Sequence, residues 1–95
     1  MLFSQKAEMT SRFSFDNPAL LRPRMSLYPE RLVLTGWRLT GRYQRVIPLR
    51  DLLEIDTPGE DRLVLWLRTG NVVRLGNVED ARRWKTVIDD RRPRG

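Results

Sequence analysis

The stretch from Glu30 to Leu75, ERLVLTGWRLTGRYQRVIPLRDLLEIDTPGEDRLVLWLRTGNVVRL, decides the fold of this chain. Short runs rich in aliphatic and β-branched residues alternate with glycine and proline, a pattern typical of antiparallel strands joined by turns. Five such runs can be recognised: Leu32–Leu34, Tyr43–Ile47, Leu52–Asp56, Leu63–Leu67 and Val72–Leu75. The sequence therefore predicts a mainly β domain.

The first hairpin of this stretch is predicted to carry exposed residues at its tip. Gly36 and Gly41 bracket Trp37–Thr40, and this spacing predicts a connection of four to six residues rather than a tight two-residue turn. An aromatic residue and an arginine, Trp37 and Arg38, are therefore expected at the tip.

The strand predicted at Leu52–Asp56 is expected to carry an acidic face. Glu54 and Asp56 alternate with Leu53 and Ile55, so the two apolar residues are predicted to point inward together. We interpret the two carboxylates as a solvated edge opposed by arginines on a neighbouring strand. The residues Thr57–Glu60 contain Pro and Gly in turn positions and predict the end of this strand.

The residues before Glu30 supply two further strands. Odd-numbered apolar residues predict an extended strand over Gln5–Ser14, and Asp16–Pro18 predicts a turn. Met25–Tyr28 resumes an alternating pattern and predicts a short strand. The chain as a whole is thus expected to contain six or seven strands.

A helix is predicted after the last strand. Asn77 is a candidate N-cap with Asp80 as the third helical residue, in an arrangement similar to a capping box. Ala81, Trp84 and Ile88 fall at positions i, i+3 and i+7, which places them on one apolar stripe. We expect this amphipathic helix to pack on the sheet through Trp84.

Length and composition favour one domain over residues 1–95, with a core from about residue 5 to 90 and a mobile basic tail at 91–95. Cysteine and histidine are both absent, which excludes thiolate and imidazole metal ligands and the commonest general base. No nucleophile or phosphate-binding loop accompanies the carboxylates. We therefore expect no cofactor, no metal site and no enzymatic activity.

The N-terminal residues Met1–Lys6 lack the apolar core of a signal peptide, and no apolar run is long enough to cross a membrane. A cytoplasmic location is expected, with peripheral contact at the inner membrane surface as an alternative.

The net charge of +6 is unevenly distributed. Residues 31–50 contain five arginines and no acid, and residues 51–61 contain five acids and no base. The basic residues are Arg31, Arg38, Arg42, Arg45 and Arg50, and the acidic patch consists of Asp51, Glu54, Asp56, Glu60 and Asp61. A basic surface attracts phosphates, whereas an arginine excess of 16 over 2 lysines also arises in proteins encoded by GC-rich genomes.

Four segments in this order resemble the strand and helix signatures of small bacterial pleckstrin-homology-like (PH-like) and GRAM-like domains. They are LYPERLVLTG (27–36), IPLRDLLEID (47–56), LRTGNVVRL (67–75) and EDARRWKTVI (79–88), and the resemblance covers residues 24–90. It implies an α+β, mainly β fold: a partly open barrel of about seven antiparallel strands in two sheets, capped by one C-terminal α-helix. Trp84 matches the helix tryptophan that packs into this barrel.

Members of the family that bind phosphoinositides use a basic motif in the first hairpin. The corresponding region here offers Lys6, Arg12, Arg22 and Arg24, which are too widely spaced to match that motif. A lipid site is therefore not carried over from the family, many of whose members bind peptides or proteins instead.

Two functional classes remain open. The first is a non-catalytic interaction or scaffolding module that binds a protein partner or associates with itself, because adjacent patches of opposite charge favour head-to-tail or two-fold contacts. The second is binding of anionic phospholipid headgroups through the arginines. Nucleic acid is disfavoured, because the aromatic residues do not interleave with the basic ones. The candidate interaction surface consists of Trp37, Arg38, Arg42, Arg45 and Trp66.

Overall fold

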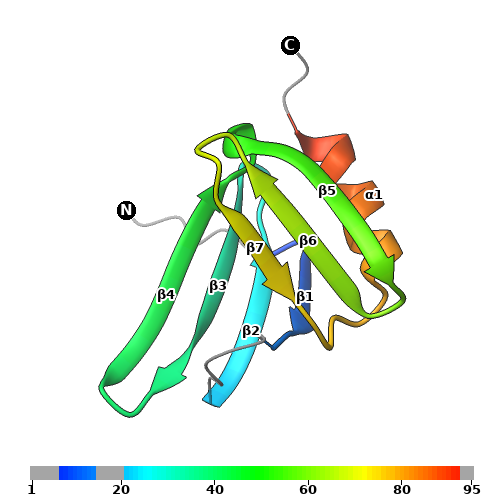
Figure 1. Cartoon of the computed structure of the whole chain (residues 1–95). Coiled ribbons are helices and arrows are strands. Elements are labelled where there is room, and N and C mark those ends of the chain that lie inside the picture. The colour runs from blue at the N-terminus through cyan, green and yellow to red at the C-terminus, as the bar shows by residue number, and fades with distance from the viewer. Residues whose placement is uncertain (1–6, 15–20, 93–95) are drawn as a thin grey trace.

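The computed structural model of the protein describes residues 7–14 and 21–92, which form seven strands, one short 3-10 helix (η1) and one α-helix (Figure 1). The elements are β1 (Met9–Arg12), β2 (Leu21–Leu27), β3 (Arg31–Arg38), β4 (Gly41–Pro48), η1 (Leu49–Asp51), β5 (Leu52–Gly59), β6 (Arg62–Leu67), β7 (Val72–Leu75) and α1 (Ala81–Arg91). Strands β1 to β4 form one antiparallel sheet and β5 to β7 form another, and the described strands do not close into a complete barrel. The predicted class, mainly β with two sheets and one C-terminal helix, is confirmed.

The core lies between the inner faces of the two sheets, where alternate strand residues point inward. Leu32 and Leu34 of β3 are fully buried, as are Leu63 and Leu65 of β6, while Leu67 is nearly so. These assignments agree with the alternation in the sequence, because a strand with one covered face needs apolar residues at every second position.

The two N-terminal strands differ from their predicted extents. β1 is four residues long, and its odd-numbered residues face inward as predicted, with Ser11 and Phe13 buried. Residues 5 and 6 and the predicted turn at Asp16–Pro18 lie outside the described residues. β2 begins at Leu21, earlier than predicted, because its pairing with β3 continues past a bulge in which Arg22 has a φ of 51°.

The β3–β4 hairpin is tighter than predicted. Arg38 pairs directly with Gly41, so the connection is the two-residue turn Leu39–Thr40, and the expected loop of four to six residues is wrong. Gly41 has a φ of 137°, a value accessible to glycine, and this lets the chain reverse over so short a distance. As a result Trp37 lies within a strand, one pair before the turn.

A bulge in β5 overturns the predicted face of Leu53. Leu52 pairs with Leu67 and Glu54 with Trp66, so β5 contains one more residue than β6 at this point. The extra residue turns outward, leaving Leu53 58% exposed while Leu52 and Ile55 are both buried. The predicted turn at Thr57–Glu60 is also wrong, because β5 continues to Gly59 and the chain turns at residues 60 and 61.

Helix α1 packs against β5 and β6 and buries Ala81, Trp84 and Ile88, which confirms the predicted stripe. Its predicted N-cap is wrong. The helix begins at Ala81 and is preceded by Asp80 in a left-handed conformation, and the Asn77 side chain instead donates from Nδ2 to Ser14 Oγ at 2.9 Å.

Tertiary contacts replace the capping side chain. The backbone N–H of Ala81 donates to the Glu60 carbonyl at 3.3 Å, and that of Glu79 donates to Ser11 Oγ at 3.0 Å. The start of the helix is therefore held by the β5–β6 turn and by β1, which sequence spacing does not reveal.

Two residues of the predicted tail, Arg91 and Arg92, form hydrogen bonds with other parts of the structure. Arg91 is the last helical residue and its Nε donates to a Glu8 carboxylate oxygen at 2.9 Å. Arg92 Nη1 donates to the carbonyl oxygens of Leu52 and Leu53 at 3.3 and 2.9 Å. Residues 93–95 lie outside the described residues.

Candidate interaction surface

The sheet formed by β1 to β4 is exclusively basic in its charged residues. Its strands contain seven arginines and no acidic residue: Arg12, Arg22, Arg24, Arg31, Arg38, Arg42 and Arg45. The sheet of β5 to β7 carries Glu54 and Asp56 together with Arg62 and Arg74, so its strands have no net charge. The asymmetry seen along the sequence therefore becomes an asymmetry between the two sheets.

The strand register divides the predicted surface between the two faces of the basic sheet. Paired residues in antiparallel strands share a face. Leu21 pairs with Trp37 and Trp37 with Arg42, which places a row of these three residues on the outer face. Trp37 and Leu21 are 51% and 64% exposed. An aromatic ring, an aliphatic side chain and a guanidinium group thus lie side by side on the surface.

Arg38 and Arg45 lie on the opposite face. Arg45 pairs with the buried Leu34, and Tyr43, two residues before Arg45 in β4, packs against the core. The Arg38 guanidinium carbon lies 4.8 Å from the centre of the Tyr43 ring, a cation–π distance. Trp37 and Arg42 on one face and Arg38 and Arg45 on the other therefore form two sites.

The tip of the hairpin presents a residue that the sequence did not single out. Leu39 is fully exposed in the two-residue turn. Figure 1 shows that the end of the hairpin bearing the turn extends away from α1 and from the second sheet. Together with Leu21 and Trp37, Leu39 gives this end of the sheet an apolar character within a basic surface. The sequence analysis did not identify this apolar end, because finding it requires the pairing register of the strands, and that register depends on the length of the turn.

Trp66 does not join this surface. It lies on β6 in the second sheet, where its cross-strand partners are Glu54 and Val72, and it is 42% exposed. Asp56 lies opposite Val64. The expectation that arginines oppose the two carboxylates across the strand pair is therefore wrong.

The acidic patch is spread along the second sheet and its connections. Asp51 lies in η1, Glu54 and Asp56 lie in β5, and Glu60 and Asp61 form the β5–β6 turn. Asp51, Glu60 and Asp61 also have structural roles through their carbonyl oxygens, which accept hydrogen bonds from Arg68, Ala81 and Val78 respectively. These acids therefore form an extended acidic border.

The outer edge of β4 is not paired with any strand in the described part of the chain. In a hairpin closed by a two-residue turn, the pair next to the turn is hydrogen bonded and the pairs then alternate. Arg42, Gln44 and Val46 consequently direct their backbone N–H and C=O groups away from β3. Pro48, which has no N–H, falls in this same outward-facing set at the end of the strand.

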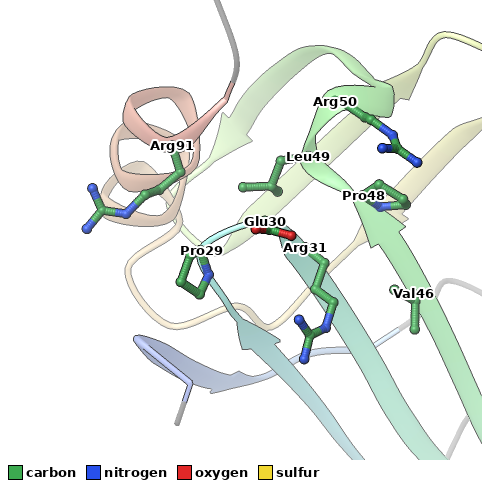
Figure 2. A pocket seen from close by; sticks show the side chains of 8 residues that line it. All are labelled: Pro29, Glu30, Arg31, Val46, Pro48, Leu49, Arg50 and Arg91. Atoms are coloured by element: carbon green, nitrogen blue, oxygen red, sulfur yellow. The ribbon is translucent and has the colours of Figure 1, made fainter. Parts of the chain in front are cut away.

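A pocket of about 370 Å³ lies at the end of this edge (Figure 2). Its lining comes from the β2–β3 turn, the end of β4, η1 and the end of α1: Pro29, Glu30, Arg31, Val46, Pro48, Leu49, Arg50 and Arg91. In Figure 2, Leu49 lies between Arg91 on one side and Arg50 on the other, and their guanidinium groups point apart. The pocket therefore has an apolar wall and a basic rim with one carboxylate.

Two of the pocket arginines interact with other side chains of the protein. The Arg31 guanidinium carbon lies 4.3 Å from the centre of the Tyr28 ring. The hydrogen bond and the charge of Glu8 raise the pKa of Arg91 above its usual value. The positive charge of Arg91 at the pocket is therefore paired with the carboxylate of Glu8.

The described residues contain no group of three or more acidic, cysteine or histidine side chains placed to hold a metal ion. Among the same residues, no helix is sufficiently long and apolar to span a bilayer. Comparison with models of known protein families and with curated proteins finds no match to this chain.

Proposed function

We propose that this protein is a non-catalytic interaction module of PH-like architecture that binds a protein partner through the β3–β4 hairpin. The observation that carries the proposal is the exposed row of Leu21, Trp37 and Arg42 on a sheet whose charged strand residues are all arginines. Tryptophan and arginine are the residue types that dominate binding energy at protein interfaces. Contact between an exposed aromatic side chain and a partner is also favourable, because it removes the apolar surface of the ring from water.

The PH-like assignment draws its support from the order of the elements. Four strands in one antiparallel sheet are followed by three in a second sheet and by one helix that carries a buried tryptophan, Trp84. That order agrees with what the resemblance in residues 24–90 implies.

Site-specific photo-crosslinking in cells tests the proposal. A photoreactive phenylalanine analogue at position 39 is expected to form a discrete covalent adduct with one protein, and the same analogue at Arg82, exposed on α1, serves as the matched control. The same adduct at both positions, or no protein adduct at position 39, would overturn the proposal.

Self-association is one form of this proposal and is separated by the same experiment. In a head-to-tail contact, the basic sheet of one copy would face the acidic border of the next. The adduct at position 39 would then have twice the mass of the chain, and sedimentation velocity would show a dimer that dissociates as salt is raised.

Binding to an anionic phospholipid surface is a second candidate function, favoured by the apolar end of the hairpin. Leu39 is fully exposed at the tip and Trp37 lies beside it, with Arg38 and Arg42 in adjoining positions. Aromatic residues and arginines are characteristic of segments that dock at the membrane interface. This candidate places the protein at the inner surface of a membrane.

Vesicle sedimentation distinguishes this second candidate. Binding to vesicles that contain phosphatidylglycerol, absent with pure phosphatidylcholine and lost on replacing Leu39 by Glu, would support it. No sedimentation at low salt, where electrostatic attraction is strongest, would exclude it.

A further inference from the structure

We propose that the outer edge of β4 takes up an extended, acidic segment of a protein partner as a fifth strand of the basic sheet. This inference rests on the proposed function and specifies the chemistry of the partner. It goes beyond the exposed side chains of the hairpin, because the backbone of Arg42, Gln44 and Val46 would hold the segment.

The other sheet edges are occupied along part of their length in the described structure. The edge of β5 is covered by α1, and Arg92 binds the carbonyl oxygens of Leu52 and Leu53 there. The ends of β1 and β7 are joined through a reciprocal pair of 2.8 Å hydrogen bonds between Ser14 and Gly76. Among the described residues, neither a packed helix nor a bridge to another strand covers the outer edge of β4. Figure 1 shows β4 as the outermost strand of its sheet.

The geometry of β4 suits the addition of a strand. It is eight residues long and pairs with β3 without a bulge from Arg31–Pro48 to Arg38–Gly41. Bulges and internal prolines are devices that prevent a sheet edge from accepting another strand, and β4 has its proline at the last position, Pro48. Seven consecutive residues therefore present a regular template.

Charge identifies the occupant as an acidic segment. Residues 31–50, which include all of β4, contain five arginines and no acid. Pairing of β4 with β4 of a second copy would bring these arginines from both chains to one seam, and like charges across a strand pair are destabilising. An acidic segment would instead be attracted, since β4 carries Arg42 on the outer face and Arg45 on the inner face of the sheet.

The pocket at the end of β4 extends the site. Val46 and Pro48 belong both to the edge and to the pocket wall, so a segment that follows the edge arrives at the pocket. Three arginines and one glutamate line it, and Arg91 is ion-paired with Glu8 and Asp90, so Arg31 and Arg50 contribute the remaining positive charge at the pocket. A side chain or terminal carboxylate of the segment would lie there, since pockets beside an added strand select for particular residues.

Amide hydrogen exchange of the full-length protein, followed by NMR, tests the inference. In the free protein, the amides of Arg42, Gln44 and Val46 are expected to exchange quickly, and those of Tyr43, Arg45 and Ile47 slowly. An eight-residue peptide of alternating Val and Glu is expected to slow exchange of the first set at least about tenfold, and a peptide of alternating Val and Lys to leave it unchanged.

Two variants separate backbone pairing from charge attraction. Gln44→Pro removes an outward-facing N–H without removing a hydrogen bond to β3, and is expected to weaken peptide binding at least about tenfold, while Gln44→Ala binds normally. The same loss is expected for the unmodified protein with a peptide whose alternate amides are N-methylated. This second arm keeps the test valid if the proline variant unfolds.

Each outcome bears on the inference separately from the proposed function. Protection confined to the Arg42, Gln44 and Val46 amides supports strand addition. Equal binding of the N-methylated peptide, or no binding of the Val–Glu peptide, overturns it. A discrete protein adduct at position 39 without added protection along β4 would leave the interaction module in place and refute the β4 edge as its binding site.

Discussion

The Nη1 atom of Arg92 donates a 2.9 Å hydrogen bond to the carbonyl oxygen of Leu53, the extra residue in the β5 bulge. A bulge leaves a backbone group without its usual ladder partner, and the guanidinium supplies one. The same Nη1 atom reaches the Leu52 carbonyl at 3.3 Å, and Nη2 lies 3.2 Å from an Asp89 carboxylate oxygen. One residue beyond the helix therefore ties α1 to the edge of the second sheet.

Replacing Arg92 by Ala is expected to lower the free energy of unfolding by about 1–3 kcal/mol, because hydrogen bonds to a charged group are lost and two carbonyl groups lose their donor. Urea denaturation measures this change. Arg92→Lys is the matched control and is expected to recover part of the loss, since an ammonium group lacks the planar fork that reaches two acceptors at once. Unchanged stability of Arg92→Ala would contradict the role assigned to this contact.

Ser11 links β1 to the start of α1. Its buried hydroxyl accepts from the Glu79 N–H at 3.0 Å and donates to the Arg12 carbonyl at 2.9 Å. Ser11→Ala is expected to cost about 1–2 kcal/mol of stability, because the Glu79 N–H is left without its acceptor. Thermal denaturation provides the measurement, with Thr10→Ala on the exposed outer face as a control that should change stability by less than about 0.5 kcal/mol.

Trp84 is the largest buried side chain in the core and is 1% exposed. Trp84→Ala is expected to destabilise the protein by about 3–5 kcal/mol, measured by urea denaturation, because it removes a large apolar contact between α1 and the sheets. Trp84→Phe retains an aromatic ring and should cost less. A Trp84→Ala variant as stable as the unmodified protein would contradict this packing.

The three tryptophans are expected to report three environments. In variants that keep one tryptophan and replace the other two by Phe, Trp84 should emit at the shortest wavelength and resist quenching by acrylamide. Trp37, which is half exposed, should be quenched readily, and Trp66 should behave similarly. On adding the Val–Glu peptide, a change in the emission of Trp37 without a change at Trp66 would place binding at the hairpin. Equal changes at both would argue against that location.

Removing the apolar end of the hairpin should separate binding from folding. Trp37→Ala is expected to change stability by less than about 1 kcal/mol, because the side chain is exposed, and to abolish the crosslinked adduct at position 39. Circular dichroism during thermal unfolding checks the first expectation. A variant that retained the adduct in full would show that Trp37 takes no part in the contact.

Alternation along the chain was sufficient to predict several strands and the buried stripe of the helix. Leu63, Leu65 and Leu67 face inward because their strand is regular, and Ala81, Trp84 and Ile88 follow the helical repeat. In both cases the nearest residues in sequence decide which side is covered. The acidic and basic segments could also be predicted, since the charge of a segment follows directly from the residues that it contains.

The errors arose where pairing with another strand sets the geometry. Leu53 points outward because β5 has one more residue than its partner β6, and this count cannot be read from β5 alone. Trp37 lies inside a strand because the β3–β4 ladder continues up to the turn, where Arg38 pairs with Gly41. The predicted surface was consequently divided between two faces and two sheets.

The sequence by itself determined that this protein is mainly β with one C-terminal helix and that its basic and acidic residues are segregated, because local periodicity and charge need no knowledge of distant contacts. The division of the strands into two sheets was implied only by the resemblance to PH-like domains. The tertiary structure decided which residues share a face, where the helix begins and which strand edge is left unpaired by the described residues. Those properties depend on register and on contacts between segments far apart in the chain, such as Ser11 with Glu79 and Arg92 with Leu53. A shift of one residue in register moves every side chain of a strand to the other face, so the row of Leu21, Trp37 and Arg42 is recognised only when the pairing is known.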